Sequence, residues 1–268
     1  MSLRLAVSGA TGRMGHTILE LAAKDPRFEI VGALESPTHA SLGRALAEVL
    51  PGVASKAKLA AKLGDLSPRP QVLIDFTQPQ GTLGYLQETA GSGIGMVIGT
   101  TGLKDDEKKK VQDASKSIPI VMATNMSVGM NLLFALVEEA AAKLGPAYDI
   151  EIIEAHHHFK KDAPSGSALS LGEAAARGRK VDLKTMSTHG REGLVGERQE
   201  GTIGFHAVRG GDIVGDHRVL FAGPGERLEL THIAHSRDAF AQGALQAALF
   251  LDGKKSGLYD MQNVLGIK

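Results

Sequence analysis

The chain has 268 residues, which is enough for two modest domains or one large one. Its 30 lysine and arginine residues balance 30 aspartate and glutamate residues, so no overall field would gather nucleic acid or an anionic membrane, and we expect neither as a partner. The absence of cysteine excludes disulfides, thiolate metal sites and cysteine nucleophiles. An apolar content of 43% with a charged content of 22% is ordinary for a globular protein and excludes a disordered chain.

Two apolar stretches bear on the location of the protein. Residues 3–7 form too short an apolar run for a signal peptide, so we expect a cytoplasmic protein. Residues 117–137 carry no charged side chain over a length that could span a bilayer. Pro119, Asn125 and Asn131 interrupt that stretch, and unpartnered amides are costly in hydrocarbon. A buried strand, a loop and a helix explain it better than a membrane span.

The first half of the chain alternates short apolar runs with charged or amphipathic stretches. This alternation is typical of βαβ units, and continuous apolar strands suit a parallel sheet that is covered on both faces. The pattern predicts strands at residues 3–8, 29–34, 71–76, 95–99 and 118–123.

The alternation of short apolar runs with charged or amphipathic stretches ends at about residue 200, and the second half of the chain is expected to be α+β. In the last predicted strand, Leu228 and Leu230 alternate with polar residues, which indicates a sheet with one buried face. An apolar helix at residues 239–251 has no sheet of its own to follow, so it could return to pack on the first half. Three segments separated by glycine-containing turns predict an antiparallel meander, at residues 202–208, 212–221 and 227–234.

A glycine loop follows the first predicted strand and opens the first predicted helix. Free backbone N–H groups and the positive end of a helix at such a position attract a dinucleotide pyrophosphate. Gly9, Gly12 and Gly15 have the spacing GxxGxxG, a variant of the common GxGxxG. Because glycines at a strand-to-helix turn also have a purely structural use, the loop alone does not decide between the two interpretations.

Glu35 lies at the end of the second predicted strand, about 20 residues beyond the glycine loop. A carboxylate at this position can accept hydrogen bonds from the adenosine ribose hydroxyls. It repels a 2′-phosphate, and the neighbouring Ser36 supplies no compensating cation, so these two residues favour NADH over NADPH. Arg13 within the glycine loop could soften that preference. The alternative is that Glu35 is a solvated acid at a strand end.

Polar turns follow two further strands of the predicted sheet, at residues 75–77 and 99–102. The carboxyl ends of the strands are the edge where open α/β sheets bind ligands. Either turn could simply cap a helix, since Thr and Asp are preferred there. Their occurrence at one edge favours a cofactor cleft.

The densest chemistry lies in residues 154–168, EAHHHFKKDAPSGSA. Its closely spaced histidines and lysines repel one another when charged, so either several stay neutral or an anion compensates them. Three interpretations are open. The histidines could be hydrogen-bonded groups at a domain seam, or His156 and His158, on one side of a strand, could bind a metal with Glu154. The third is an anionic substrate site in which a histidine transfers protons and a lysine pairs with a carboxylate.

The turn after this cluster strengthens the third interpretation. Pro164 and Ser165 lead into an alanine-rich run, so Gly166 and Ser167 would offer backbone N–H groups and a hydroxyl at a helix N-terminus. A carboxylate would bind well there. A helix needs a cap in any case, so the turn by itself is not diagnostic.

Seven motifs together carry a resemblance over nearly the whole chain: GATGRMG, IDFT, GMVIGTTG, NMSVGMN, EAHHHFKKDAPSGSA, GTIGFHAVRGGDIVGDH and GERLELTHIAHSR. In this order they resemble the 4-hydroxy-tetrahydrodipicolinate reductase (dihydrodipicolinate reductase) family of diaminopimelate and lysine biosynthesis. The histidine-rich motif is highly specific, whereas the glycine loop alone would not be.

The resemblance implies a fold and an activity. The fold would be an α/β Rossmann-like nucleotide-binding domain formed by residues 1–127 and 236–268, with an inserted α+β substrate-binding and tetramerisation domain at residues 128–235. The activity would be NAD(P)H-dependent reduction of 4-hydroxy-tetrahydrodipicolinate to tetrahydrodipicolinate with loss of water. The expected partners are a small-molecule dicarboxylate substrate, NADH or NADPH, and further copies of the chain in a homotetramer.

The resemblance also implies roles for individual residues. His156 would be the principal proton donor or acceptor and Lys160 the second proton donor, while His157, Gly166 and Ser167 would hold the substrate carboxylates. No residue is expected to bind a metal. The cofactor site would be lined by residues from four strand ends: Gly9, Ala10, Thr11, Gly12, Arg13, Met14, Glu35, Gly99, Thr100, Thr101, Ala123, Thr124, Asn125 and Met126.

The sequence departs from the family pattern at two of these positions and at Ser36, which follows Glu35. Ser36 stands where many members have an arginine, which puts an NADPH preference in doubt. Met126 replaces a frequent phenylalanine, and Ser167 replaces a threonine but retains the hydroxyl. Two other functions are kept open: a nicotinamide oxidoreductase that acts on a different amino acid or imine, and a nucleotide-sensing protein without turnover.

Overall fold

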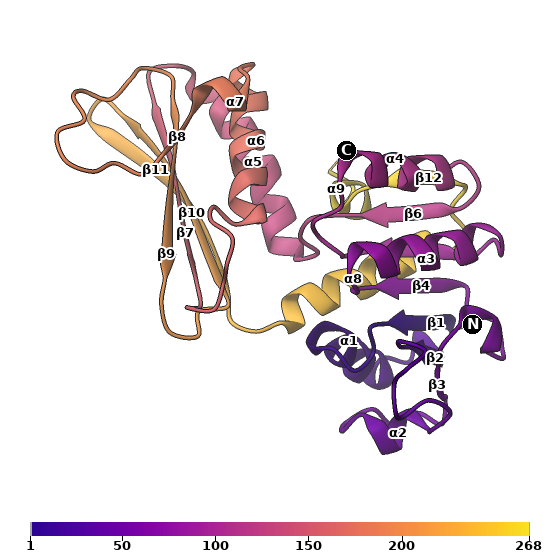
Figure 1. The fold of residues 1–268 in the computed structure, drawn as a ribbon. Coiled ribbons are helices and arrows are strands. Elements are labelled where there is room, and N and C mark those ends of the chain that lie inside the picture. The colour runs from indigo at the N-terminus through magenta and orange to yellow at the C-terminus, as the bar shows by residue number, and fades with distance from the viewer. Residues whose placement is uncertain (1, 268) are drawn as a thin grey trace. The chain divides into compact units, whose positions relative to one another are not determined.

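A computed structural model of the chain describes residues 2–267, which form two compact units (Figure 1). The first unit contains the chain up to Ser127 together with Arg237–Gly266, and the second contains Val128–Ser236. Each unit has its own sheet and its own hydrophobic core. None of the helices within residues 2–267 is long and apolar enough to cross a membrane.

The first unit is built on a parallel sheet of seven strands in the order β12-β6-β5-β4-β1-β2-β3. Two short strands that the sequence pattern did not predict, β3 (Leu59–Ala60) and β12 (Gly257–Tyr259), form its edges. The five predicted strands are confirmed with small differences at their ends, as β1 (Leu3–Ser8), β2 (Phe28–Leu34), β4 (Val72–Asp75), β5 (Gly95–Ile98) and β6 (Pro119–Met122).

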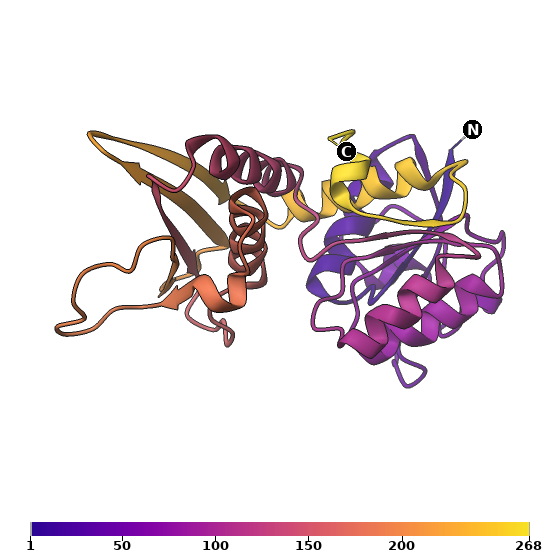
Figure 2. The same cartoon turned by 90° about the horizontal axis from the view of Figure 1, so that it is seen from above.

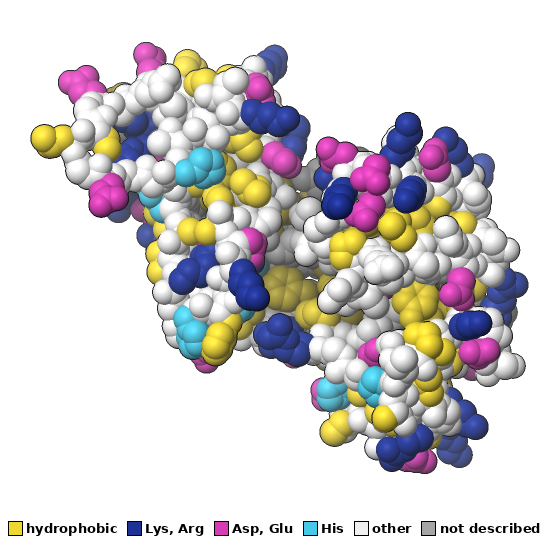
Figure 3. All heavy atoms as spheres, viewed as in Figure 1, with side chains coloured by type: hydrophobic (Ala, Val, Ile, Leu, Met, Phe, Trp, Pro, Cys, Tyr) yellow, Lys and Arg dark blue, Asp and Glu magenta, His cyan; other side chains and the backbone are white. Residues whose placement is uncertain are grey.

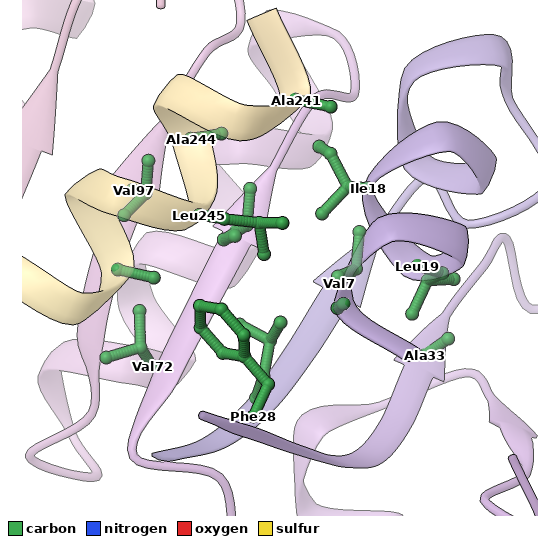
Figure 4. Packing of buried hydrophobic residues seen from close by; sticks show 14 of the residues in the cluster. Val7, Ile18, Leu19, Phe28, Ala33, Val72, Val97, Ala241, Ala244 and Leu245 are labelled. Carbon is green, nitrogen blue, oxygen red and sulfur yellow. The ribbon is translucent and has the colours of Figure 1, made fainter. Parts of the chain in front are cut away.

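Helices cover both faces of this sheet. On one face, α1 (Arg13–Lys24) packs beside α8 (Asp238–Leu251), the helix that returns from the C-terminal part of the chain. Figure 4 shows Ile18 of α1 and Leu245 of α8 pointing toward side chains of the strands. On the other face, α3 (Pro79–Ala90) packs beside α4 (Asp105–Ala114). Shorter pieces are α2 (Leu46–Val49), the 3₁₀ helix η1 (Leu63–Asp65) and α9 (Met261–Val264).

The second unit has a mixed sheet of five strands in the order β11-β10-β7-β9-β8. Only β10 and β11 form an antiparallel hairpin, whereas β9 runs parallel to both β7 and β8. The predicted antiparallel meander is therefore wrong, because β7, which precedes these strands by many residues, inserts between β9 and β10. The strands are β7 (Asp149–His156), β8 (Ser187–His189), β9 (Ile203–Arg209), β10 (Gly215–Gly223) and β11 (Glu226–Ala234).

Two helices, α5 (Val128–Leu144) and α6 (Gly166–Arg179), pack on each other and on one face of this sheet (Figure 2). A short helix, α7 (Leu183–Met186), follows α6. The alternation of buried and half-buried residues along β7 matches a strand with one face toward these helices. Its opposite face, here called the open sheet face, carries Val208 and Ile233, which are 50% and 53% exposed.

Candidate active site

The glycine loop forms a tight turn between β1 and α1. Gly9 has a φ of +67°, a left-handed conformation that favours glycine. A Cβ added to Gly15 would lie 2.2 Å from the Gly9 carbonyl oxygen, so only glycine lets α1 start directly against the loop. The first turn of α1 has no acidic residue, and its leading N–H groups have no partner within the helix. These features suit a phosphate group at the helix end.

The predicted cofactor residues gather at one edge of the first sheet because they follow the carboxyl ends of parallel neighbours. Residues 9–14 follow β1, Glu35 follows β2, residues 99–101 follow β5 and residues 123–126 follow β6. A cleft of about 1060 Å³ lies at this edge. The members of the predicted set that line the cleft are Gly9, Thr11, Gly12 and Glu35.

Three of the predicted cofactor residues are buried instead. Ala10, Thr100 and Met126 are 0%, 6% and 1% exposed, so their side chains shape the core beneath the edge. The Met126 carbonyl oxygen lies so close to Gly243 of α8 that a Cβ there would be 1.7 Å away. This contact fixes the end of the segment after β6 against the returning helix.

Glu35 is tied to the glycine loop. Its carboxylate accepts hydrogen bonds from the Thr11 backbone N–H at 2.8 Å and from the Thr11 hydroxyl at 2.7 Å. The Ser36 backbone N–H donates to the same carboxylate at 3.2 Å. Ser36 itself supplies no cation, but Lys62, to which sequence analysis assigned no role, lines the same cleft. Lys62 follows the short strand β3, and the local sequence gave no signal that it would reach the nucleotide edge.

Asp75 lies beneath this edge as a fully buried carboxylate. Four hydroxyl groups donate to it, from Ser8 at 2.6 Å, Thr77 at 2.8 Å, Thr82 at 2.5 Å and Thr100 at 2.9 Å. The polar turn predicted at residues 75–77 therefore joins the ends of β1, β4 and β5 to the first turn of α3.

The second unit brings the histidine-rich motif to the end of β7. His156 is 9% exposed, and Glu154 on the same face of the strand is 1% exposed. Their side chains join through a hydrogen bond of 2.6 Å between His156 Nδ1 and Glu154 Oε2. Burial lowers the pKa of His156, although the hydrogen bond and charge of Glu154 oppose that effect. The strand ends at His156, so the expectation that His156 and His158 lie on one side of a strand is wrong.

Arg209, at the end of β9, pairs with Glu154 through both guanidinium nitrogens. Nη1 lies 2.8 Å from Oε2 and Nη2 lies 2.8 Å from Oε1, and the latter nitrogen also donates to the Asp162 carbonyl oxygen. Burial alone would raise the pKa of Glu154, but the hydrogen bonds from Arg209 and His156 lower it. Glu154 is therefore a buried carboxylate with a cation on one side and an imidazole on the other. Sequence analysis assigned no role to Arg209, which lies within the motif GTIGFHAVRGGDIVGDH.

The start of α6 is attached to the same carboxylate. Ser165 caps the helix by accepting from the Ala168 N–H at 3.1 Å, and its own N–H donates to Glu154 Oε1 at 3.1 Å. Its hydroxyl also lies 3.0 Å from His217 Nε2. The ring of His217 packs edge-on against His156 at 5.1 Å. Sequence analysis assigned no role to His217, the last residue of the motif GTIGFHAVRGGDIVGDH.

The remaining predicted residues lie around this cluster. Lys160 is half-buried and pairs with Asp162 at 2.9 Å. His157 has a buried Nδ1 without a hydrogen-bond partner in the described part of the chain. Gly166 and Ser167 form the first turn of α6, where backbone N–H groups point out of the helix. Figure 3 shows lysine, arginine and histidine side chains gathered on the second unit, which suits an anionic ligand.

A parallel sheet covered on both faces, with a glycine loop at its carboxyl edge and a separate unit built on a mixed sheet, defines the class of two-unit Rossmann-type oxidoreductases. The comparisons with known proteins place the chain within that class. Models of the dihydrodipicolinate reductase N-terminus and C-terminus match residues 3–126 and 129–265.

Relatives carry the same name over their full length. The protein named 4-hydroxy-tetrahydrodipicolinate reductase from Thiobacillus denitrificans is 50% identical, with 100% of each chain covered. The protein of that name from Nitrosomonas eutropha is 52% identical, with 99% of each chain covered. The chain belongs to the dihydrodipicolinate reductase family, whose members are NAD(P)H-dependent oxidoreductases of lysine and diaminopimelate biosynthesis.

Solved structures agree with this fold. One described as dipicolinate-bound dihydrodipicolinate reductase from Paenisporosarcina sp. TG-14 has a TM-score of 0.77 and 26% identity, and the match covers 98% of this chain and 99% of that one. GenD2 from gentamicin A biosynthesis, in complex with NAD, has a TM-score of 0.62 at 11% identity, with 99% of this chain and 91% of that chain covered. At that identity the likeness concerns the fold alone.

Proposed function

We propose that this chain reduces 4-hydroxy-tetrahydrodipicolinate to tetrahydrodipicolinate with NAD(P)H and releases water, in diaminopimelate and lysine biosynthesis. The observation that carries this proposal is the buried Glu154–His156 pair at the end of β7, in a chain about half identical to reductases of that name. In this proposal, the first unit binds the nucleotide and the second unit binds the substrate.

The substrate is a dicarboxylate, and the second unit offers groups that suit its charges. The first turn of α6 provides the backbone N–H groups of Gly166 and Ser167 at the positive end of a helix, together with the Ser167 hydroxyl. His157 supplies a buried nitrogen that has no hydrogen-bond partner within residues 2–267. We assign these three residues to the substrate carboxylates. The similar structure whose description includes bound dipicolinate, itself a ring dicarboxylate, supports the assignment.

His156 is assigned as the proton donor. The nicotinamide, when bound, supplies the hydride. The substrate first loses its hydroxyl as water, which leaves an unsaturated ring. Hydride then adds to C4 of that ring, and the adjacent carbon takes up a proton. Glu154 holds the Nδ1 side of His156, which leaves Nε2 to carry that proton. A Cβ at Gly215 would lie 3.1 Å from Nε2, so glycine keeps this approach open.

The substrate's own charge prepares His156 for this role. Burial lowers the pKa of the free imidazole, so in the absence of substrate it is mostly neutral near pH 7. A bound dianion favours the imidazolium and raises the pKa, so proton uptake accompanies substrate binding. Lys160 lies close enough to affect the same imidazole and stabilises the charge that develops on the ring.

For the nucleotide we propose a preference for NADH that is not absolute. Glu35, which follows β2 and is hydrogen-bonded to the glycine loop, would accept hydrogen bonds from a ribose and repel a 2′-phosphate. Lys62 in the same cleft provides a cation that a 2′-phosphate could approach, so NADPH remains usable.

We further propose that the protein is a homotetramer assembled through the second unit. The open sheet face supports this, because its exposed Val208 and Ile233 resemble the apolar part of a subunit interface. We also propose a cytoplasmic location for this reaction. Light scattering of the purified protein and cell fractionation test these two statements.

The assignment of the acid is tested by His156→Asn and Lys160→Ala, with His158→Ala as a matched control in the same motif. His158 is exposed and lies beyond the strand end. We expect His156→Asn to lower kcat by about 10²–10⁴-fold, the usual contribution of a general acid. Lys160→Ala should also lower kcat, while NADH affinity in a fluorescence titration stays unchanged in all three variants. Equal losses of turnover and NADH affinity would show that His156 and Lys160 are structural.

A further inference from the structure

We propose that Glu154, neutralised by Arg209, is the positioning residue that aligns the proton donor with the substrate-binding turn. The inference rests on the proposed function, because it assumes that His156 moves the proton. Glu154 is 1% exposed, so it acts on the reaction through the groups that it holds.

The two oxygens of Glu154 serve two different parts of the site. Oε2 lies 2.6 Å from His156 Nδ1, whereas Oε1 accepts the Ser165 backbone N–H at 3.1 Å. Ser165 is the N-cap residue of α6, so its position sets the position of the first turn of that helix. A single rigid carboxylate therefore fixes the imidazole and the carboxylate-binding turn relative to each other.

The hydrogen bond also selects the tautomer of His156. An ionised carboxylate can only accept, so Nδ1 must carry a hydrogen when it faces Glu154. Nε2 is then the nitrogen that gains and loses a proton. A carboxylate at this position stabilises the imidazolium, as in catalytic triads.

Arg209 explains how such a carboxylate can remain charged while buried. Its guanidinium makes two hydrogen bonds of 2.8 Å to Glu154, a geometry that supplies both charge and orientation. Without this cation the pKa of Glu154 would rise, although the hydrogen bond from His156 would still lower it. Arg209 therefore keeps Glu154 ionised, so the proton that the two side chains share stays on His156.

Glu151 supplies a matched comparison within the same strand. It accepts from Arg191, Arg198 and His206, so it has the same kinds of partners as Glu154. Its side chain lies on the opposite face of β7, as the alternation along the strand requires. Removing its charge disturbs an ion-pair network of similar composition without touching His156.

The pH dependence of the reaction separates positioning from folding. Glu154 raises the pKa of His156, and the positive charges around the imidazole lower it. Replacing the acid by an amide should therefore move the pH above which kcat/KM declines to lower values. Loss of the Arg209 charge should move it to higher values. The titratable and charged groups that face His156 are Glu154 from β7, Lys160 from the following loop, Arg209 from β9 and His217 from β10.

The experiment compares Glu154→Gln, Glu154→Asp and Arg209→Gln with Glu151→Gln in the full-length protein. Steady-state rates are measured as a function of pH, and dipicolinate and NADH affinities by calorimetry. We expect Glu154→Gln to lower kcat about tenfold or more and to weaken dipicolinate binding, with NADH affinity unchanged. Glu154→Asp keeps the negative charge, so its pH profile should shift in the same direction as that of Glu154→Gln but by less. Arg209→Gln should shift the profile in the opposite direction, and Glu151→Gln should leave it unchanged.

Each outcome decides between the two proposals. If His156→Asn lowers kcat but the profile of Glu154→Gln coincides with that of the wild type, the positioning role is refuted while the proposed function stands. If His156→Asn leaves kcat unchanged, the proposed function itself is wrong. If Glu154→Gln does not fold, the opposite shifts expected for Glu154→Asp and Arg209→Gln still decide. Profiles of these two variants that match the wild type would overturn the inference.

Discussion

His217 should make the stability of the protein depend on pH. Burial lowers the pKa of this imidazole to about 3, with a further contribution from the charge of His156. In an unfolded chain the pKa is about 6.5. Between these values the unfolded chain binds a proton that the folded chain does not, so stability falls as the pH falls below about 6.5. From about pH 7.5 to about pH 5.5, His217 alone lowers the free energy of unfolding by about 1.4 kcal/mol.

Urea unfolding at these two pH values, at one fixed protomer concentration, measures the effect. The comparison is between the wild type, His217→Gln and the control His158→Gln, because Gln keeps a polar group toward Ser165 without titrating. When the pH is lowered between these two values, the free energy of unfolding should fall by about 1.4 kcal/mol more in the wild type and the control than in His217→Gln. Glu151 and Glu154 do not contribute to the difference, because their pKa values are lowered from an ordinary value that already lies below this window. Equal losses in all three proteins would refute the argument from burial.

Three changes at the nucleotide edge have expected results. Gly15→Ala places a Cβ 2.2 Å from the Gly9 carbonyl oxygen, so it should cost about 1–3 kcal/mol in thermal unfolding and weaken NADH binding; normal NADH affinity would contradict this. Glu35→Gln removes the charge that repels a 2′-phosphate, so kcat/KM for NADPH should rise relative to NADH. Lys62→Ala should lower kcat/KM for NADPH roughly fivefold, or about 1 kcal/mol, and leave kcat/KM for NADH unchanged. Unchanged nucleotide ratios would show that neither residue faces the 2′ position.

Local signals were sufficient for the five inner strands of the first sheet and for the residues that resemble the family motifs. Short apolar runs bounded by turns gave the five strands, and the glycine loop lies where a strand meets a helix. Pairing between distant segments was not visible in the same way. The place of β7 between β9 and β10 depends on contacts through space, which periodicity along the chain does not report.

The same limit applies to the active site. Glu154 and His156 are two residues apart, and the sequence placed them together. Their partners come from far along the chain, since Arg209 lies 55 residues from Glu154 and His217 lies 52 residues from Ser165. Neither partner stands in a pattern that a helix or strand period would reveal. Lys62 was missed for a related reason, because it follows a strand of only two residues.

The most direct test of the account follows nucleotide oxidation by its absorbance while dihydrodipicolinate synthase makes the unstable substrate in place. NADH and NADPH are compared with and without each substrate of the synthase. We predict oxidation that requires both synthase substrates and is faster with NADH. No oxidation of either nucleotide, in a protein shown to bind them, would contradict the account and favour a different imine substrate or a nucleotide sensor.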